Sequence, residues 1–457
     1  MDGFLFETGP EGEETAKAAS ARGKPRLRVP VRDQVEMHCA ALDEVLGAEH
    51  PARAVWTAVC GLDLGRWLNE IKSVERHVGR DATDPRLLLA LWVYATLDGV
   101  ASARELDRLC AHHAAYRWLA GGVSVNYHLL ADFRSRNAAA WEELLTQLVA
   151  SLMAEGLVTM NRVAQDGMRV RADAGASSFR RRETLEECLK QAREQVRTLE
   201  QLADDDPEEL TKRRRAAQAR AAAERQARIE EALRNCEELR KRREANEKKS
   251  GRAPGGERAS TTDPDARKMK FADNGYRPGY NVQFDTDTDA GIIVGVDVVN
   301  EGTDAGQLAP MLKQAQRRYG RAPEEKLVDG GFVTNEALHA AAEAECVVYT
   351  PLKDAEKKLA EGADPFARRR GDDDVIAAWR ARMGTAVGQS LYKLRAQTAE
   401  WVNAGCRNRA LWRMPVRGLW RMPVRGLAKV RIIAHLQALA HNLRHALRLR
   451  AARATAA

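Results

Sequence analysis

The sequence predicts a mixed α/β protein in which helices pack on a five-stranded mixed sheet. Apolar and polar residues alternate, as in half-buried strands, in "NRVAQDGMRVRADA", in "GYNVQFDTDTDAGIIVGVDVV" and in the shorter runs "EKLVDGG" and "CVVYTPL". The polar turn inside the second run predicts a hairpin, and amphipathic helical patterns separate the later runs. Strands interleaved with helices in this order predict a sheet with helices packed on it.

Changes in composition divide the chain into five predicted parts. They are a disordered tail (1–30), a helical domain (31–158), an α/β domain in two pieces (159–180 and 261–410), a coiled-coil insertion with its loop (181–260), and a basic linker and helix (411–457). The tail is rich in Gly, Glu, Ala and Pro, a composition that cannot bury enough apolar surface to fold.

The helical domain contains two short helical patterns on either side of Gly121 and Gly122. This arrangement resembles a helix-turn-helix, in which Arg134 and Arg136 are available to contact DNA. An ordinary helical bundle explains the same pattern equally well, because helix pairs joined by a glycine turn are common.

The insertion is almost purely charged, with apolar residues at alternating spacings of four and three. These residues are Leu185, Leu189, Ala192, Val196 and Leu199, followed later by Ile229, Leu233 and Cys236. The stretch "DDDP" interrupts the pattern, which predicts an antiparallel coiled-coil hairpin. A solvated stalk is the favoured interpretation, and contact with DNA or with a second subunit is the alternative.

The net charge of +8 is unevenly placed, because no Asp or Glu follows Glu400. The basic residues after that point include Arg407, Arg409, Arg413, Arg417, Arg421, Arg425, Lys429, Arg431, Arg444, Arg448 and Arg450. A segment with one sign of charge favours a polyanion, and nucleic acid fits it better than a membrane surface does.

A membrane protein is not expected. The longest apolar run, "LLLALWVYATL", is much shorter than the roughly 20 residues that a spanning helix needs. The first residues are acidic and lack the apolar core of an export signal. Seven scattered cysteines without a CxxC pair fit reduced thiols, so a cytoplasmic location is predicted.

Three acidic residues are candidates for chemistry: Asp166 in the first strand, Asp329 at the tip of a later strand, and Glu400 on a helix. At about 100° per residue, one arc of roughly 140° of that helix carries five polar residues. They are Tyr392, Arg395, Glu400, Asn403 and Arg407. This face is too polar for a core and suits a site where a carboxylate meets a metal while arginines hold phosphates.

Each acidic candidate also has a structural explanation. The dipeptide Asp166-Gly167 is a strong signal for a hairpin turn. Asp329 could belong to a strand-to-helix turn that its two following glycines permit. Glu400 could form an ion pair with Arg395 or Arg407.

One acidic stretch, "DTDTDAG", imitates the start of a calcium-binding loop. Ala290 occupies the position that requires glycine, and Val296 stands where a bidentate glutamate is needed. The alternation around it predicts a hairpin tip and no calcium site.

Several longer segments are similar to bacterial insertion-sequence transposases of the DDE class, which are built on a ribonuclease-H-like catalytic fold. They are "DPRLLLALWVYATLDGVASARELDRLCAHHAAYRWLAGG", "ADFRSRN", "VAQDGMRVRADA", the region from "TTDPDARKMKF" to "DAGQLAPML", "LVDGGF", "YKLRAQTAEWVNAGCRNRAL" and "RGLAKVRIIAHLQALAHNL". The Tyr-x-x-Arg-x-x-x-x-Glu spacing in the sixth segment is the most specific of these features.

The resemblance implies that Asp166, Asp329 and Glu400 form a metal-binding catalytic triad. It further implies that Tyr392, Arg395, Asn403 and Arg407 contact DNA near the active site. Asp304 is the rival to Asp329, ranked lower because capping of the following helix explains it.

The resemblance also implies the chemistry and the partners. Two Mg²⁺ ions, or Mn²⁺ in their place, would activate a water or 3′-hydroxyl and stabilise the leaving oxygen. The expected substrate is double-stranded DNA, both the element's ends and the target, bound by a nucleoid-associated homodimer. Two alternatives are a non-catalytic DNA-bridging protein and a metal-dependent nuclease without strand transfer.

A tandem repeat departs from the family pattern. The eight residues of Leu411–Gly418 occur again as Leu419–Gly426. The extra copy is expected to form a kinked loop before the last helix, 432–449, and it puts the activity of this chain in question more than its fold.

Overall fold

Strand β1 (Arg162–Arg171) lies at the centre of the sheet. It pairs parallel with β7 (Glu325–Leu327), which pairs parallel with β8 (Val347–Tyr349).

The structure is a computed structural model that describes residues 39–74, 80–201, 209–250, 256–407 and 421–456. The predicted disordered tail at 1–30 lies outside the described residues.

The other side of β1 pairs antiparallel with the 12-residue strand β5 (Tyr276–Asp287). Two strands share the far side of β5: β4 (Arg267–Lys270) pairs with its beginning and β6 (Ile293–Val299) with the remainder. The mixed α/β fold class is confirmed, with one correction: within the described residues the sheet has six strands instead of five. The difference arises because β5 begins at Tyr276, before the predicted start at Gly279, and so leaves an edge for β4.

The N-terminal region is helical, as predicted. Its elements are η1 (Leu42–Val45), α2 (Pro51–Cys60), α3 (Gly65–Leu68), α4 (Pro85–Asp98), α5 (Ala103–His112), α6 (Ala114–Ala120), α7 (Tyr127–Ser135) and α8 (Ala138–Ala154). Among the described helices of this region, α4 is the most buried. It begins where the Asp84 side chain accepts a hydrogen bond from the N–H of Arg86, and it ends at the left-handed Gly99.

The glycine turn between the two short helices is present. Gly121 and Gly122 both have left-handed backbone angles, φ +58° and +80°, which end α6 before α7 begins. Helix α5 packs against both α6 and α7. A role of these helices as a DNA-reading helix-turn-helix stays a prediction.

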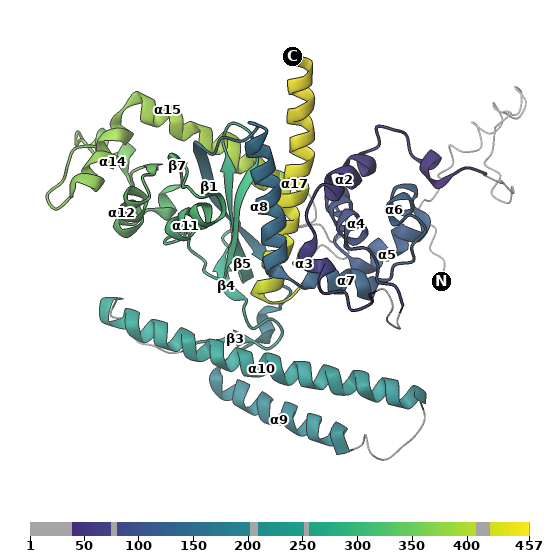
Figure 1. The fold of residues 1–457 in the computed structure, drawn as a ribbon. Helices are drawn as coiled ribbons and strands as arrows, with labels where there is room; N and C mark the ends of the chain where they lie inside the picture. Colours follow the sequence, from purple (N-terminus) through teal and green to yellow (C-terminus); the bar gives the residue numbers. More distant parts are fainter. Residues whose placement is uncertain (1–38, 75–79, 202–208, 251–255, 408–420, 457) are drawn as a thin grey trace, which may run out of the picture. The chain divides into compact units, whose positions relative to one another are not determined.

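The charged insertion forms two antiparallel helices, α9 (Arg182–Gln201) and α10 (Glu209–Ser250) (Figure 1). Ion pairs cross between them from Arg182 to Glu237 at 2.8 Å and from Arg193 to Glu230 at 3.1 Å. A small apolar cluster that includes Leu185, Ala192, Ile229 and Cys236 holds the pair together. The short strands β2 (Phe179–Arg180) and β3 (Ala259–Ser260) pair at its base. The "DDDP" segment lies outside the described residues, and coiling of the two helices stays a prediction.

The second piece of the α/β domain supplies the helices that pack near the sheet. They are α11 (Leu308–Tyr319), η4 (Gly330–Phe332), α12 (Asn335–Glu343), α13 (Ala355–Ala360), α14 (Asp374–Gly384), α15 (Ala386–Arg395), the π-helical turn η5 (Ala396–Glu400) and α16 (Trp401–Arg407). Helix α15 packs on β1, β7 and β8, and η5 packs on β1 and β5. This packing carries Glu400 to the central strand.

The last helix, α17 (Leu427–Ala456), is a core element. It is longer than predicted, beginning before Ile432 and ending after Leu449, and it packs against α4, α8 and β6 (Figure 1). The buried Asn442 side chain donates to the carbonyl of Ile293 at 2.7 Å and accepts from the N–H of the same residue at 2.8 Å. The helix therefore completes the hydrogen bonds at the start of β6.

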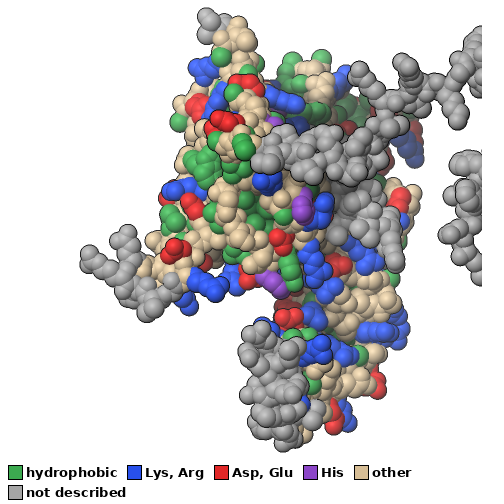
Figure 2. Space-filling view, turned by 90° about the vertical axis from the view of Figure 1, so that its right-hand side faces the viewer, with side chains coloured by type: hydrophobic (Ala, Val, Ile, Leu, Met, Phe, Trp, Pro, Cys, Tyr) green, Lys and Arg blue, Asp and Glu red, His purple; other side chains and the backbone are tan. Residues whose placement is uncertain are grey.

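The basic charge of this helix is partly paired within the chain. Arg431 lies 2.9 Å from Asp297, and Arg450 lies 2.5 Å from Glu155. On the face shown in Figure 2, Lys and Arg side chains are interspersed with Asp and Glu. The described part of the predicted basic tail is therefore not a free polycation.

The described end of the second repeat docks on the sheet. The N–H of the buried Met422 donates to the carbonyl of Arg171 at the end of β1 at 2.8 Å. Arg425 pairs with Asp173 at 2.8 Å, and the N–H of Gly426 donates to Asp263 at 3.1 Å. Residues 408–420, which contain the first copy, lie outside the described residues.

No single helix in the described ranges is long and apolar enough to span a membrane, although α4 and α5 together, bent by 99°, pass that test by length and composition.

Deleting one repeat unit is expected to leave the fold intact. The two copies are identical, so removing either one gives the same sequence, and the remaining copy can make the contacts of Met422 and Arg425. We expect calorimetry to give a melting temperature close to that of the full chain. As a comparison, Met422→Ala should cost about 2–5 kcal/mol because it leaves a cavity. A large drop in the melting temperature of the deletion variant would show that the first copy is also needed for the fold.

Stability is expected to fall on acidification because of His435 on α17. This histidine is buried, and burial, helped by the Arg318 guanidinium, lowers its pKa from 6.5 to about 4. In the unfolded chain His435 is protonated below about pH 6.5, whereas in the folded chain it stays neutral down to about pH 4. The free energy of unfolding therefore falls as the pH is lowered between these two values. The loss should reach about 3 kcal/mol at the acidic end.

Urea unfolding near pH 7 and near pH 5 measures this effect. His435→Gln should reduce the difference between the two conditions, and His128→Gln, at an exposed histidine, serves as the comparison. An unchanged pH dependence in His435→Gln would contradict the assignment.

Candidate active site

The three acidic candidates meet around one guanidinium. Nη2 of Arg395 lies 3.6 Å from Oδ1 of Asp166 and 3.6 Å from Oδ2 of Asp329. Nη1 of the same arginine lies 3.6 Å from Oε1 of Glu400. Residues far apart in the sequence, on β1, after β7 and on η5, are thus brought to a single buried cation.

Asp166 lies in the middle of β1, opposite Phe284 of β5. The hairpin-turn explanation of Asp166-Gly167 is therefore wrong. Gly167 has a different role: a β-carbon there would collide with Oδ1 of Asp304 and would stand 2.7 Å from the Gln283 amide nitrogen. The glycine is required for close approach of these side chains, not for a turn.

Asp329 follows β7 and also caps the short turn η4. Its side chain accepts a hydrogen bond from the N–H of Gly331. The turn is therefore present, but neither Gly330 nor Gly331 has the left-handed backbone angle expected to permit it. One oxygen of the 47% exposed side chain caps the turn, and the other lies 3.6 Å from Arg395.

Glu400 reaches the site through a change of helical register. In a regular α-helix, residues five apart point about 140° away from each other. The π-helical turn η5 separates Arg395 from Glu400, and its i→i+5 spacing stacks residues five apart on one side. The expected ion pair between the two is present, with the Glu400 side chain 64% exposed.

Two further predicted residues lie at the same place. The Asn403 side chain on α16 donates to Oδ2 of Asp166 at 2.8 Å. Tyr392 is partly buried. Burial raises its pKa, the Arg395 guanidinium opposes that rise, and the charges of Asp329, Asp166 and Glu400 add to it. Of the polar arc predicted from the helical period, Arg395, Glu400 and Asn403 are thus joined to one another and to Asp166 by side-chain contacts.

Burial raises the pKa of Asp166, and the Arg395 guanidinium and the Gly167 N–H oppose that rise. The charges of Asp304 and Asp329 raise it further. Asp166 is the most enclosed of the three candidates, so its ionised form depends most on a neighbouring cation.

Asp304 lies beside the site, and the capping explanation offered for it is wrong. Gln307, not Asp304, is at the N-cap of α11. The Asp304 carboxylate instead accepts hydrogen bonds from the side chains of Asn281 at 2.7 Å and Gln283 at 2.8 Å. Both amides lie on the inner strand β5, a placement that strand pairing decides and that local sequence does not signal.

The oxygen atoms at this site are of the type that Mg²⁺ binds, but the side chains are not arranged around an ion. Mg²⁺ prefers oxygen ligands at about 2.0–2.1 Å, and three carboxylates are present beside the buried Oδ1 of Asn403, which has no hydrogen-bond partner. Within the described residues, however, no group of three or more His, Cys, Asp or Glu side chains is arranged to hold an ion. The guanidinium of Arg395 instead lies 3.6 Å from each of the three carboxylates.

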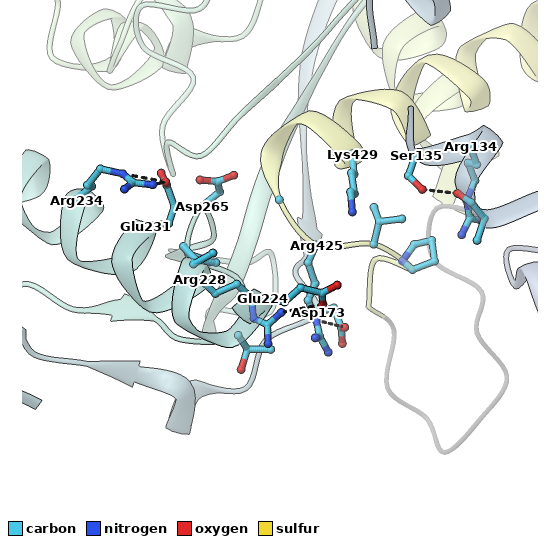
Figure 3. A pocket seen from close by; sticks show the side chains of 17 residues that line it. Arg134, Ser135, Asp173, Glu224, Arg228, Glu231, Arg234, Asp265, Arg425 and Lys429 are labelled. Atoms are coloured by element: carbon cyan, nitrogen blue, oxygen red, sulfur yellow. Dashed lines mark hydrogen bonds and ion pairs between the residues drawn. The ribbon is translucent and has the colours of Figure 1, made fainter. Parts of the chain in front are cut away.

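A cavity of about 800 Å³ lies elsewhere, between α7, α10 and the docked repeat (Figure 3). Its charged lining residues are Arg134, Arg228, Arg234, Arg425 and Lys429 with Asp173, Glu224, Glu231 and Asp265. Both signs of charge are represented, which does not favour a polyanion, and none of the residues around Arg395 lines it.

Residues 41–136 match the family model described as "Transposase domain (DUF772)". The match supports a transposase. The matched transposase domain ends before β1, so it does not include Asp166, Asp329 or Glu400. Comparison with curated proteins and with solved structures found no match.

Within the matched region, the prediction that Arg134 contacts DNA needs correction. Its guanidinium is buried, lies 4.1 Å from the centre of the Trp92 ring and donates to the carbonyl of Ala101 at 2.5 Å. Burial lowers its pKa to about 10. Arg134 therefore belongs to the core of the N-terminal helical region.

The other two predicted DNA contacts differ in their surroundings. Arg136 is exposed and pairs with Asp132 at 3.1 Å, so it stays available to a ligand. Arg407 is the last residue of α16, and its side chain lies outside the described residues.

Replacing Arg395 is expected to destabilise the metal-free protein. Arg395→Gln leaves the enclosed Asp166 carboxylate without its countercharge, which should cost about 3–5 kcal/mol in urea unfolding without divalent ions. Adding Asp166→Asn should recover part of that loss, because it removes the unpaired charge. Lys393→Gln, an exposed neighbour on α15, should change little. Equal losses of unfolding free energy in Arg395→Gln and Lys393→Gln would contradict the structural role of Arg395.

Proposed function

We propose that this chain is a DDE transposase, which cleaves the ends of its insertion sequence and joins them to target DNA. The observation that carries the proposal is the meeting of Asp166, Asp329 and Glu400, each within 3.6 Å of the Arg395 guanidinium. Structural ion pairs usually need one carboxylate for one arginine. Three carboxylates on one cation leave an excess of negative charge, which suits divalent metal ions.

The chemistry would be phosphodiester hydrolysis followed by transesterification. Two bound Mg²⁺ or Mn²⁺ ions would supply a deprotonated nucleophile and stabilise the leaving 3′ oxygen. Asp166, Asp329 and Glu400 would hold them. Asn403 orients the Asp166 carboxylate through its 2.8 Å hydrogen bond, so the deepest ligand is fixed before the others close.

Arg395 has two roles in this proposal. In the metal-free protein it offsets the repulsion among the carboxylates. With metal bound to the carboxylates, its guanidinium would be free to pair with the scissile phosphate. Tyr392, whose pKa the charges of the same carboxylates raise, would contact that strand.

The matched transposase domain supports DNA as the substrate. The exposed Arg136 on this domain is available for contacts to the duplex outside the carboxylate site. A homodimer on DNA is part of the proposal, because two element ends must be held together for joining. A nuclease without strand transfer and a non-catalytic DNA-bridging protein are the outcomes that the following experiment separates.

Asp329→Asn is expected to reduce Mg²⁺-dependent cleavage of element-end DNA by at least about 100-fold, since removal of a metal-bound carboxylate disables the site. Binding of the same DNA in a gel-shift assay should remain, because asparagine can still cap η4. Asp364→Asn is the matched control: Asp364 also accepts a hydrogen bond from an N–H two residues later, that of Phe366 at 2.8 Å, but it does not contact Arg395.

The products distinguish the alternatives. A joined product from wild-type protein supports a transposase, and cleavage without joining indicates a nuclease. Binding without any cleavage by wild-type protein would leave the DNA-bridging alternative, and cleavage by Asp329→Asn at the wild-type rate would overturn the site assignment.

A further inference from the structure

The way in which Arg395 is held differs from that of Arg380, an arginine of similar exposure. The Arg395 guanidinium lies 3.6 Å from each of three carboxylates, which is beyond the length of a hydrogen bond. The Arg380 guanidinium lies 2.7 Å from the Asp372 carboxylate and donates a hydrogen bond to it. Charge therefore attracts Arg395 to its position, but among the described residues no hydrogen bond fixes its guanidinium there.

Two unpaired polar atoms accompany this loose arrangement. Within the part of the chain that the structure describes, the buried Nε of Arg395 has no hydrogen-bond acceptor, and the buried Oδ1 of Asn403 has no donor. Both side chains contact Asp166, Arg395 at 3.6 Å and Asn403 at 2.8 Å. An unpaired buried donor or acceptor costs free energy, so movement of the guanidinium toward a new acceptor would recover stability.

A divalent ion at the carboxylates would compete with this guanidinium. Both are cations attracted by the same three side chains, and a carboxylate that one cation already stabilises gains less from a second. Like charges a few ångströms apart also repel each other. At its present distances of 3.6 Å, Arg395 should therefore lower the affinity of the carboxylates for metal.

A DNA phosphate would change this balance. Arginine pairs with phosphate through charge-assisted hydrogen bonds of about 2.7–2.9 Å, which are shorter than its separations from the carboxylates. A phosphate beside the site would thus attract the guanidinium away from the carboxylates and leave them free for metal. The converse holds as well, because metal at the carboxylates would repel the guanidinium toward the phosphate.

We propose that Arg395 couples metal binding to DNA binding, as an internal cation that occupies the carboxylates until a phosphate attracts it away. The inference rests on the proposed function, because it needs both ligands at the carboxylate site. Without DNA, the site binds Mg²⁺ or Mn²⁺ weakly. With DNA, it binds the metal tightly, and by thermodynamic linkage the metal strengthens DNA binding by the same factor. The site thus becomes competent for hydrolysis when its substrate is in place.

Calorimetric titration with Mn²⁺ measures this coupling in the wild-type protein. Mn²⁺ is titrated into the protein alone and into its complex with an element-end duplex that has already been cleaved, so that no hydrolysis accompanies binding. The duplex should raise the affinity for Mn²⁺ by about tenfold or more. In fluorescence anisotropy, Mn²⁺ should raise the affinity for the same duplex by an equal factor.

Three variants test the internal cation itself. Arg395→Gln should raise the Mn²⁺ affinity of the DNA-free protein by about tenfold and remove the further gain from DNA. Arg395→Lys keeps the positive charge and should retain part of the wild-type coupling. Arg380→Gln is the matched control, since the Arg380 side chain is 12% exposed, against 11% for Arg395, but pairs with Asp372. It should bind Mn²⁺ as the wild-type protein does, with and without DNA.

The outcomes separate this inference from the proposed function. Wild-type protein that cleaves DNA but binds Mn²⁺ equally well with and without the duplex overturns the coupling alone. An Arg395→Gln protein with the wild-type affinity for Mn²⁺ does the same. If Arg395→Gln does not fold, the wild-type titrations still test the coupling, because they need no variant. Wild-type protein that binds no Mn²⁺, with or without DNA, overturns the proposed function as well.

Discussion

The contact of Arg395 with three carboxylates is the constraint on which the rest of the site depends. Like charges that share a site raise each other's pKa and repel, and burial adds to that penalty for Asp166. One guanidinium with two separate amino groups can face several carboxylates at once, which a lysine cannot do with the same geometry. The fold therefore assembles these acidic residues around a cation of the chain itself.

That constraint also explains features of the backbone around it. The π-helical turn η5 places Glu400 over the same side as Arg395, at the cost of regular helical hydrogen bonding. Gly167 allows Asp304 and Gln283 to crowd against β1, so a network of amides surrounds the central strand. Irregular backbone and close approaches gather where the carboxylates meet, as expected of a functional site.

Helix α17 connects this site to the remainder of the molecule. It packs on α4 and α8 of the N-terminal helices and on β6 of the sheet, and its histidines support Trp401. A segment whose composition suggested a DNA-binding tail is thus largely a core helix, and its basic charge is partly paired within the chain. In the proposed function, affinity for DNA would come from exposed groups such as Arg136 and from the carboxylate site.

The sequence by itself determined the fold class, the helical N-terminal region, the antiparallel helical hairpin and the polar helix face at Tyr392, Arg395, Glu400 and Asn403. These follow from local periodicity, since side chains three to four or two residues apart share a face in any helix or strand. Only the tertiary structure decided which groups meet. Strand pairing put Asp166 opposite Phe284 instead of in a turn, burial removed Arg134 from the surface, and side-chain hydrogen bonds from β5 held Asp304 away from the cap of α11. Such contacts join residues from 21 positions apart, as between Gln283 and Asp304, to 237 positions apart, as between Asp166 and Asn403, and no local pattern encodes them.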